Sequence, residues 1–310
     1  TLTTQNGISG SFDSSTGELT VSGTASLANY EIALRSITYN STSEEPTLIN
    51  NSRTITWIIT DANSENLGAK ISISTVSTIT IIPLSDAPVV TVAGTLAYTE
   101  NGSAEIIDNT IIISDPDDIE FSGVSVTISD DFTTGDVLIL TTQNGISGSF
   151  DSSTGKLTVS GTASLASYEV ALRSITYYST SEDPTIMSDS RSITWIVTDA
   201  DSEGLGAKSS EPVVSTISIT PLNDLPVVTA GGTLNYTENG SAEVVDNSIS
   251  ISDPDDIELT SANVTISDGF TTGDVLTLTT QNGISGNFDS LTGVLTISGT
   301  ASLANYETAL

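Results

Sequence analysis

The sequence repeats itself at a fixed interval of 138 residues. The segment TTQNGISG begins at Thr3, Thr141 and Thr279, and Trp57 is separated from Trp195 by the same interval. A fixed period means that each repeat is one structural unit, and a period of this length suits a whole small domain rather than one rung of a solenoid. The sequence therefore predicts a tandem array of domains.

Two segments rich in proline and acidic residues mark where one repeat passes into the next. They are PLSDAPVV at 83–90 and PLNDLPVV at 221–228, and each lies between two apolar, strand-like runs. We therefore predict a complete module at 88–225, preceded at 1–87 by the C-terminal part of one module and followed at 226–310 by the N-terminal part of the next. On this phasing, we expect the chain to be a window from a longer array.

Within one module the hydrophobic pattern has the period of a β-strand. In SITWIVTD, at 192–199, apolar side chains alternate with polar ones, and VSTISITP at 214–221 alternates in the same way. These two segments predict a hairpin, and SLASYEVALRSI at 164–175 has the spacing of one short helix. Many short strands with one helix predict an all-β fold of tandem antiparallel β-sandwich modules. We expect a core containing Leu165, Leu172, Ile193, Trp195, Val197, Ile217 and Ile219.

Composition excludes several classes of function. The chain contains no Cys and no His, which removes thiolate sites, the usual transition-metal ligands and the commonest general base. Its 39 acidic and 7 basic residues give a net charge of -32, which repels nucleic acids and anionic membrane surfaces. No apolar run approaches the length needed to span a membrane, so we expect no membrane insertion. Hard cations, which take oxygen ligands, suit this composition best.

The topology of a sandwich predicts where the acidic residues of the complete module meet. The chain entry, the loop after the second strand and the loop between the last two strands all lie at one end of a seven-stranded sandwich. Carboxylates gathered there repel one another, and Ca²⁺, which takes six to eight oxygen ligands, relieves that repulsion. The alternative is a set of solvated turns, because Asp favours turns in any case. The predicted ligands are Asp86 at the entry, Asp115, Asp117 and Asp118 in the second-strand loop, and Asp199 and Asp201 in the last loop.

The same pattern returns one repeat later. The ligands predicted for the next junction are Asn223, Asp224, Asp253 and Asp255, joined by Glu100 from the preceding module, while Asp61 is the first copy's counterpart of Asp199. Glu31 and Glu169, which lie on the predicted helices, are further candidates for the first and the second junction. The expected cofactor is Ca²⁺ at both places.

Several motifs resemble those of cadherin modules. YTENG at 98–102 resembles their acidic first-loop motif, DPDD at 115–118 their Asp-x-Asp motif, and NDLP at 223–226 a shortened cadherin linker. The whole chain resembles the cadherin-like tandem repeats of giant bacterial surface adhesins of the RTX-adhesin extender type. The resemblance implies calcium-dependent modules in a secreted, extracellular protein. Because the linker is reduced and the Asp-Arg-Glu motif is absent, it implies one or two ions per junction rather than three.

Three kinds of function follow from these expectations. The first is a structural extender: a calcium-rigidified rod for cell adhesion or biofilm attachment, whose partners are adjacent modules of the same chain. The second is the repeat unit of an extracellular filament or sheath, in which like chains are partners. The third is a carbohydrate-binding module or a glycosidase, and it is disfavoured because the chain lacks His and Cys and because we expect Trp57 and Trp195 to be core anchors.

Overall fold

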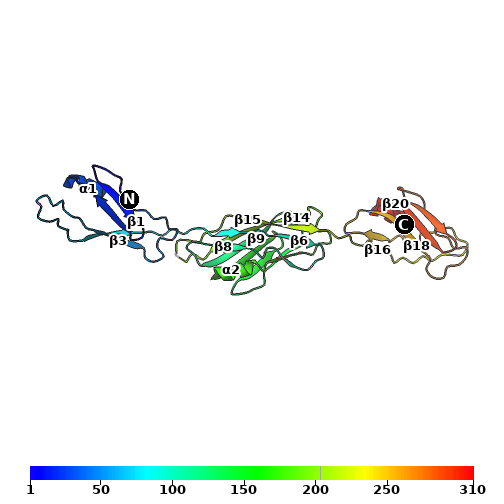
Figure 1. Ribbon diagram of the computed structural model, residues 1–310. Coiled ribbons are helices and arrows are strands. Elements are labelled where there is room, and N and C mark those ends of the chain that lie inside the picture. Colours follow the sequence, from blue (N-terminus) through cyan, green and yellow to red (C-terminus); the bar gives the residue numbers. More distant parts are fainter. Residues whose placement is uncertain (203) are drawn as a thin grey trace. The chain divides into compact units, whose positions relative to one another are not determined.

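A computed structural model describes residues 1–202 and 204–310 of the chain. The chain folds into two compact units. The first unit comprises residues 1–88 with the loops 114–120 and 198–209, and the second comprises 89–113, 121–197 and 210–310. The elements are labelled in Figure 1.

The first unit contains two hairpins and one helix. Its elements are β1 (Ser9–Asp13), β2 (Glu18–Ser22), α1 (Leu27–Arg35), β3 (Ser52–Trp57) and β4 (Thr75–Thr80). Strands β1 and β2 pair antiparallel, as do β3 and β4. Trp57 is only half-buried and donates its Nε1–H to Ser77 Oγ at 2.7 Å, so the expectation of a fully buried anchor fails here. The reason is that, in the described residues, the β3–β4 pair forms a sheet with no third strand beside it.

The second unit contains a β-sandwich between residues 89 and 220. Its larger sheet has the order β11-β12-β9-β14-β15-β6, and its smaller sheet has the order β10-β13-β7. Figure 1 shows β9, β14 and β15 side by side, with α2 against the sandwich. The elements are β5 (Val89–Thr91), β6 (Thr95–Thr99), β7 (Glu105–Ile106), β8 (Ile112–Ser114), β9 (Glu120–Asp130), β10 (Asp136–Ile139), β11 (Ser147–Asp151), β12 (Lys156–Ser164), α2 (Leu165–Leu172), β13 (Thr176–Ser179), β14 (Ser190–Asp199) and β15 (Val213–Thr220).

The predicted core of this sandwich is confirmed. Along β14 every second residue is buried, which is the pattern of a strand with one face on a core. Trp195 is fully buried and donates its Nε1–H to Ser215 Oγ at 2.8 Å on the paired strand β15. The other predicted residues are buried as well, except Leu165, which is partly buried against the cluster. Removing these side chains from water is the main favourable term for the fold.

One pairing departs from the antiparallel prediction. Strand β6 pairs parallel with β15, so that Leu96 lies opposite Ile217 and Tyr98 opposite Ile219. The first long strand of the sandwich and its last strand therefore lie at one edge of the larger sheet and run in the same direction. The predicted β14–β15 hairpin is antiparallel, as expected.

Residues 226–310 carry a second hydrophobic cluster in the same unit. The elements are β16 (Val227–Thr229), β17 (Ser250–Ser252), β18 (Glu258–Thr265), β19 (Ser285–Asp289), β20 (Val294–Ser302) and α3 (Leu303–Ala309). Strands β16 and β17 form a pair, and β18, β20 and β19 form a three-stranded sheet. Ile284, Ile297 and Tyr306 are fully buried in this cluster. The division into modules at 88 and 226 stays a prediction.

The repeated TTQNGISG segment is a tight turn that a later glycine closes. In the complete sandwich, Gln143 and Ile146 form an isolated bridge, and the Ile146 side chain is fully buried. Gly161 lies against this turn with φ of +127°, and a Cβ placed on it would lie 2.2 Å from the Gly145 carbonyl oxygen. The same approach occurs at Gly23 and Gly299. In all three copies the turn therefore lies against a glycine that cannot carry a Cβ without a clash.

Candidate metal centre

The DPDD segment folds into an acidic loop directly after β8. Asp115 Oδ1 accepts hydrogen bonds from the backbone N–H groups of Asp117 at 3.1 Å and Asp118 at 2.9 Å, which is the local turn that Asp favours. This turn brings one carboxylate oxygen from each of Asp115, Asp117 and Asp118 within 4.8 Å of the others. The loop therefore gathers three acidic groups by itself.

Two further segments of the first unit attach to this loop. The backbone N–H of Asp86, in the linker after β4, donates to Asp117 Oδ2 at 2.9 Å. The backbone N–H of Ser202 donates to Asp118 Oδ1 at 3.0 Å, and Asp118 is buried. The three segments that topology predicted to meet therefore do contact one another through these backbone donors.

Part of the carboxylate surface in this loop is buried without a partner. Asp115 Oδ2 and Asp117 Oδ1 are both buried and neither makes a hydrogen bond. Burial, with a contribution from the neighbouring Asp117, raises the pKa of Asp115 to about 6. Buried, unpaired carboxylate oxygens are the donors that a hard cation requires, so these residues fit a bound Ca²⁺.

A second group of carboxylates forms one repeat later, within the second unit. It consists of Glu100, at the end of β6, with Asp224 and Asp255, whose oxygens lie within 4.8 Å of one another. The backbone N–H of Asp224 donates to Asp255 Oδ2 at 2.5 Å, which repeats the Asp86–Asp117 contact at the 138-residue interval. The two sites are thus built on the same linker-to-loop hydrogen bond.

Glu100 is the most buried member of the second group. Its side chain is 1% exposed; Oε2 accepts from the Leu222 backbone N–H at 2.8 Å, and Oε1 has no partner. Asp224 Oδ2 is likewise buried and unpaired. Burial raises the pKa of Glu100, and the charges of Asp255, Asp224 and Asp183 raise it further. An ionised glutamate in this position needs a positive charge beside it.

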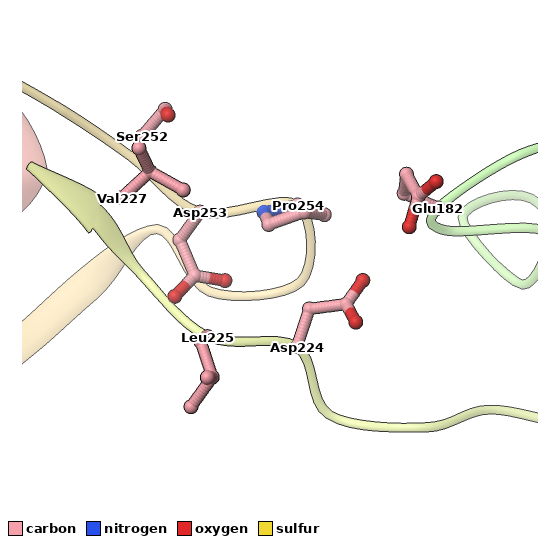
Figure 2. Close-up of a pocket in the computed structure, with 7 residues that line it drawn as sticks. All are labelled: Glu182, Asp224, Leu225, Val227, Ser252, Asp253 and Pro254. Carbon is pink, nitrogen blue, oxygen red and sulfur yellow. The ribbon is translucent and has the colours of Figure 1, made fainter.

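A cleft opens next to the second group. Figure 2 shows Asp224 and Asp253 on one side of it and Glu182 on the other, with Leu225 and Pro254 completing its wall. Asp253 carries the loop turn, because its Oδ1 accepts from the backbone N–H groups of Asp255 at 3.0 Å and Asp256 at 2.9 Å. It occupies the same position in the loop as Asp115 does one repeat earlier.

Four of the predicted ligands lie outside the two groups and hydrogen-bond to the backbone, so their role as ligands stays a prediction. Asp199 is buried, and both of its carboxylate oxygens accept from the Lys208 N–H, at 3.0 and 2.8 Å. Asp61 Oδ1 accepts from Lys70 N–H at 3.1 Å, as the counterpart residue does. Asp201 Oδ1 accepts from the Gly206 N–H at 2.6 Å, and the exposed Asn223 side chain donates to the Asp224 carbonyl at 2.9 Å. These four residues order the loops around the two carboxylate groups.

The helix glutamates also lie outside the two groups. Glu169 forms an ion pair with Arg173 at 3.1 Å and accepts from the Ile113 N–H at 3.2 Å, so it fastens α2 to β8. Glu31 forms an exposed ion pair with Arg35 at 3.6 Å. Each pairs with an arginine one helical turn away, and their role at a junction stays a prediction.

Sequence reasoning missed a loop that carries two acids, Glu182 and Asp183. Glu182 lines the cleft beside Asp224, and the charge of Asp183 acts on Glu100. The available signal was the recurrence of Ser-Glu-Glu-Pro-Thr at 43–47 as Ser-Glu-Asp-Pro-Thr at 181–185. This recurrence points to the site only once the fold is known to bring the loop to the end of β6.

The raised pKa of Asp115 predicts how stability depends on pH when no calcium is bound. A carboxyl whose pKa rises on folding stabilises the fold in its protonated form, and this stability is lost as pH rises through the folded pKa of about 6. We expect the chain in chelator to have a higher thermal midpoint at pH 5 than at pH 7. Asp115→Asn, which cannot ionise, is expected to reduce this difference. An equal difference in both proteins would contradict the assignment.

Comparison with known proteins finds similarity to one protein in sequence and to several in structure. No protein-family model matches it. A segment of 101 residues, 31% of the chain, is 36% identical to halomucin from Haloquadratum walsbyi (strain DSM 16790 / HBSQ001), and it covers 1% of that protein. Among solved structures, the protocadherin gamma B2 extracellular cadherin domains 1–5 align over 97% of this chain and 45% of their own, with 12% identity and a TM-score of 0.31. Drosophila N-cadherin EC1-4 aligns over 84% of this chain and 52% of its own, with 14% identity and a TM-score of 0.28.

The chain thus spans about half of these cadherin structures, or less, and a very small part of halomucin. Across residues 1–202 and 204–310, no helix combines the length and apolar character needed to cross a bilayer.

Proposed function

We propose that this chain is a structural extender repeat of a large secreted surface protein, and that bound Ca²⁺ stiffens its modules into a rod. The observation that carries the proposal is the repeated pairing of a linker Asp with a loop Asp. Asp86 with Asp117 and Asp224 with Asp255 make the same backbone-to-carboxylate contact, and buried carboxylate oxygens remain unpaired at both places. A site that recurs with the repeat serves the array rather than one reaction.

The donor set favours calcium among the common cations. All the ligands offered are carboxylate oxygens, in a chain without His or Cys, and carboxylate-rich sites suit Ca²⁺ better than Zn²⁺ or Cu²⁺. Asp86, Asp115, Asp117 and Asp118 would hold an ion at the first site, and Glu100, Asp224 and Asp255 at the second. Bound there, it neutralises their mutual repulsion. We expect a Kd on the order of 10⁻⁴ to 10⁻³ M, as for other extracellular modules.

Stiffening follows because each site includes a linker residue and a loop of the following repeat. With the carboxylates neutralised, the linker is tied to the loop by the ion as well as by one hydrogen bond. Without it, like charges only a few ångströms apart repel by roughly 1 kcal/mol per pair in water, and by more in the protein. We infer that each linker then becomes a hinge between folded modules, so the extender role depends on external calcium.

Small-angle scattering of the 310-residue chain, with calcium and with chelator, tests this proposal. We expect calcium to increase the maximum dimension of the chain. Asp117→Asn with Asp255→Asn, which removes one ligand from each site, is expected to abolish the calcium response. Asp130→Asn with Asp268→Asn is the matched control, because it removes two exposed charges at the same 138-residue spacing and leaves both groups intact. The proposal fails if calcium has no effect on the unmodified chain, or if both variants respond alike.

One observation favours the filament as a second candidate function. The loop after the acidic pair exposes two adjacent large apolar side chains in both copies, Leu48 and Ile49 at 73% and 94%, and Ile186 and Met187 at 69% and 76%. Recurring exposed apolar side chains are typical of a contact surface. Scattering mass that rises with protein concentration, and falls in Ile186→Ser with Met187→Ser, would support lateral assembly of like chains.

A further inference from the structure

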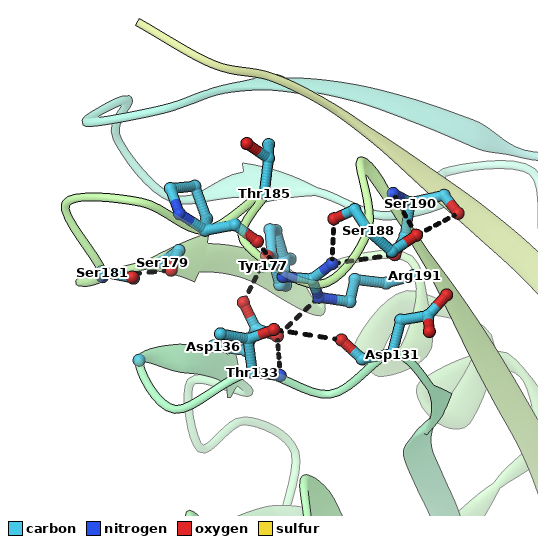
Figure 3. Close-up of polar contacts among 12 residues, drawn as sticks. Asp131, Thr133, Asp136, Tyr177, Ser179, Ser181, Thr185, Ser188, Ser190 and Arg191 are labelled. Carbon is cyan, nitrogen blue, oxygen red and sulfur yellow. Dashed lines mark hydrogen bonds and ion pairs between the residues drawn. The ribbon is translucent and has the colours of Figure 1, made fainter. Parts of the chain in front are cut away.

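A buried arginine holds the acidic loop between β13 and β14 in one conformation. Arg191 is fully buried at the start of β14, and Figure 3 shows its guanidinium enclosed by the loop. Its Nη2 donates to the Pro184 carbonyl at 2.6 Å, and its Nη1 donates to the carbonyls of Ser188 at 2.9 Å and Ser190 at 2.8 Å. The residues just before Pro184 therefore have a fixed backbone anchor.

The arginine is itself fixed by a buried carboxylate. Arg191 Nε donates to Asp136 Oδ2 at 2.6 Å, and the same oxygen accepts from the Thr133 N–H at 2.8 Å. Asp136 Oδ1 accepts from the Tyr177 hydroxyl at 2.6 Å. The Tyr177 ring packs against Tyr98 with the ring centroids 5.1 Å apart, in an edge-to-face arrangement. Tyr98 is on β6, two residues before Glu100, so one packed network joins the loop anchor to the strand that leads into the buried glutamate.

The anchored loop presents Glu182 and Asp183 toward the second carboxylate group. Glu182 lines the cleft that Asp224 also lines, and Figure 2 shows its carboxylate on the opposite side of that cleft. Asp183 uses Oδ1 to accept from the backbone N–H and the hydroxyl of Thr185, at 3.1 and 3.2 Å. This local turn fixes the Asp183 side chain.

The same arginine-anchored acidic loop occurs in the first copy of the repeat. Glu44 and Glu45 precede Pro46, and Arg53 Nη2 donates to the Pro46 carbonyl at 2.5 Å. Arg53 Nη1 donates to the Asn50 carbonyl at 2.6 Å, as Arg191 Nη1 does to Ser188. Both copies thus place two acids directly before a proline whose carbonyl is bound by a β-strand arginine. Solvated surface acids need no such anchor.

We propose that Glu182 and Asp183 form a further side of the cation site at Glu100, Asp224 and Asp255, and that this loop sets the affinity of the site for a divalent cation. The inference rests on the proposed function, since it concerns the same site. Glu100 provides the independent indication of a ligand, because it is 1% exposed and its Oε1 has no partner. The binding free energy of a divalent cation becomes more favourable with each anionic charge fixed nearby. The network around Arg191 fixes the loop that carries Glu182 and Asp183.

Calorimetric titration of CaCl₂ into the 310-residue chain tests the inference. The background carries Asp115→Asn and Asp117→Asn, so that the second site is the one measured. Glu182→Gln with Asp183→Asn is expected to raise Kd by roughly tenfold, because two negative charges near a divalent ion are removed. Asp130→Asn with Glu211→Gln is the matched control; it removes two exposed charges elsewhere in the second unit and is expected to change Kd less than about twofold.

The outcomes separate the two proposals. A large rise in Kd in the loop variant alone, with a thermal midpoint in chelator no lower than that of the background chain, supports the inference. If the background chain binds calcium and both variants weaken it equally or not at all, the inference is overturned while the proposed function stands. If the unmodified chain itself binds no calcium at 10 mM or below, a limit about tenfold above the weakest Kd expected, the proposed function fails and the inference fails with it.

Discussion

Asp136→Ala is expected to lower the free energy of unfolding of the sandwich by about 3–5 kcal/mol, because it leaves the Arg191 guanidinium buried without its counter-charge. Both side chains are fully buried in their ion pair, so water cannot replace the lost carboxylate without opening the core. The measurement is urea unfolding followed by tryptophan fluorescence in a Trp57→Phe background, which leaves Trp195 as the reporter of this sandwich.

Two comparisons make this result specific. Asp130→Ala removes an exposed charge from strand β9 of the same sandwich, and its expected effect is below about 1 kcal/mol. Asp136→Leu combined with Arg191→Met removes both buried charges and is expected to recover only part of the lost stability, because it leaves the Tyr177 hydroxyl and the Pro184 carbonyl without their partners. Equal losses of unfolding free energy in Asp136→Ala and Asp130→Ala would contradict the buried-pair account.

Gly161→Ala is expected to destabilise the same sandwich by about 3 kcal/mol or more. The residue has φ of +127°, which L side chains rarely adopt, and its new Cβ would meet the Gly145 carbonyl oxygen at 2.2 Å. Gly145→Ala is the matched control: it also has a positive φ, of +80°, but its Cβ would meet no atom within 4 Å. We expect that control to cost about 1–2 kcal/mol, from backbone strain alone. Similar losses in the two variants, by urea unfolding, would show that the close approach is unimportant.

Most of the sandwich could be predicted from local sequence patterns. The alternation through Trp195 indicated which face of β14 is buried, and the Asn144-Gly145 pair supplied the positive φ that its turn requires, with +50° and +80°. These features depend on neighbouring residues along one strand or turn. The parallel pairing of β6 with β15 could not be read this way, because it joins segments more than a hundred residues apart.

The sequence indicated which acidic residues lie near the candidate site, but not which of them could bind an ion and which order a loop. Asp115 and Asp117 lie in the first group and Asp224 and Asp255 in the second, whereas both carboxylate oxygens of Asp199 accept from the Lys208 backbone N–H. An Asp that orders its own loop and an Asp that faces an ion have the same sequence signature, since both favour turns. Only the three-dimensional positions of backbone donors separate them.

The parallel β6–β15 ladder has a mechanical consequence. The chain enters the sandwich through the short strand β5, reaches β6 at Thr95, and leaves the sandwich after β15, at Thr220. Tension applied along the chain therefore pulls these two paired strands in opposite directions along their length. In this geometry the hydrogen bonds of the ladder share the load in shear and must break together, whereas an antiparallel hairpin pulled from its open end breaks one bond at a time. Resistance to force is then set by the barrier to unfolding rather than by the equilibrium stability of the module.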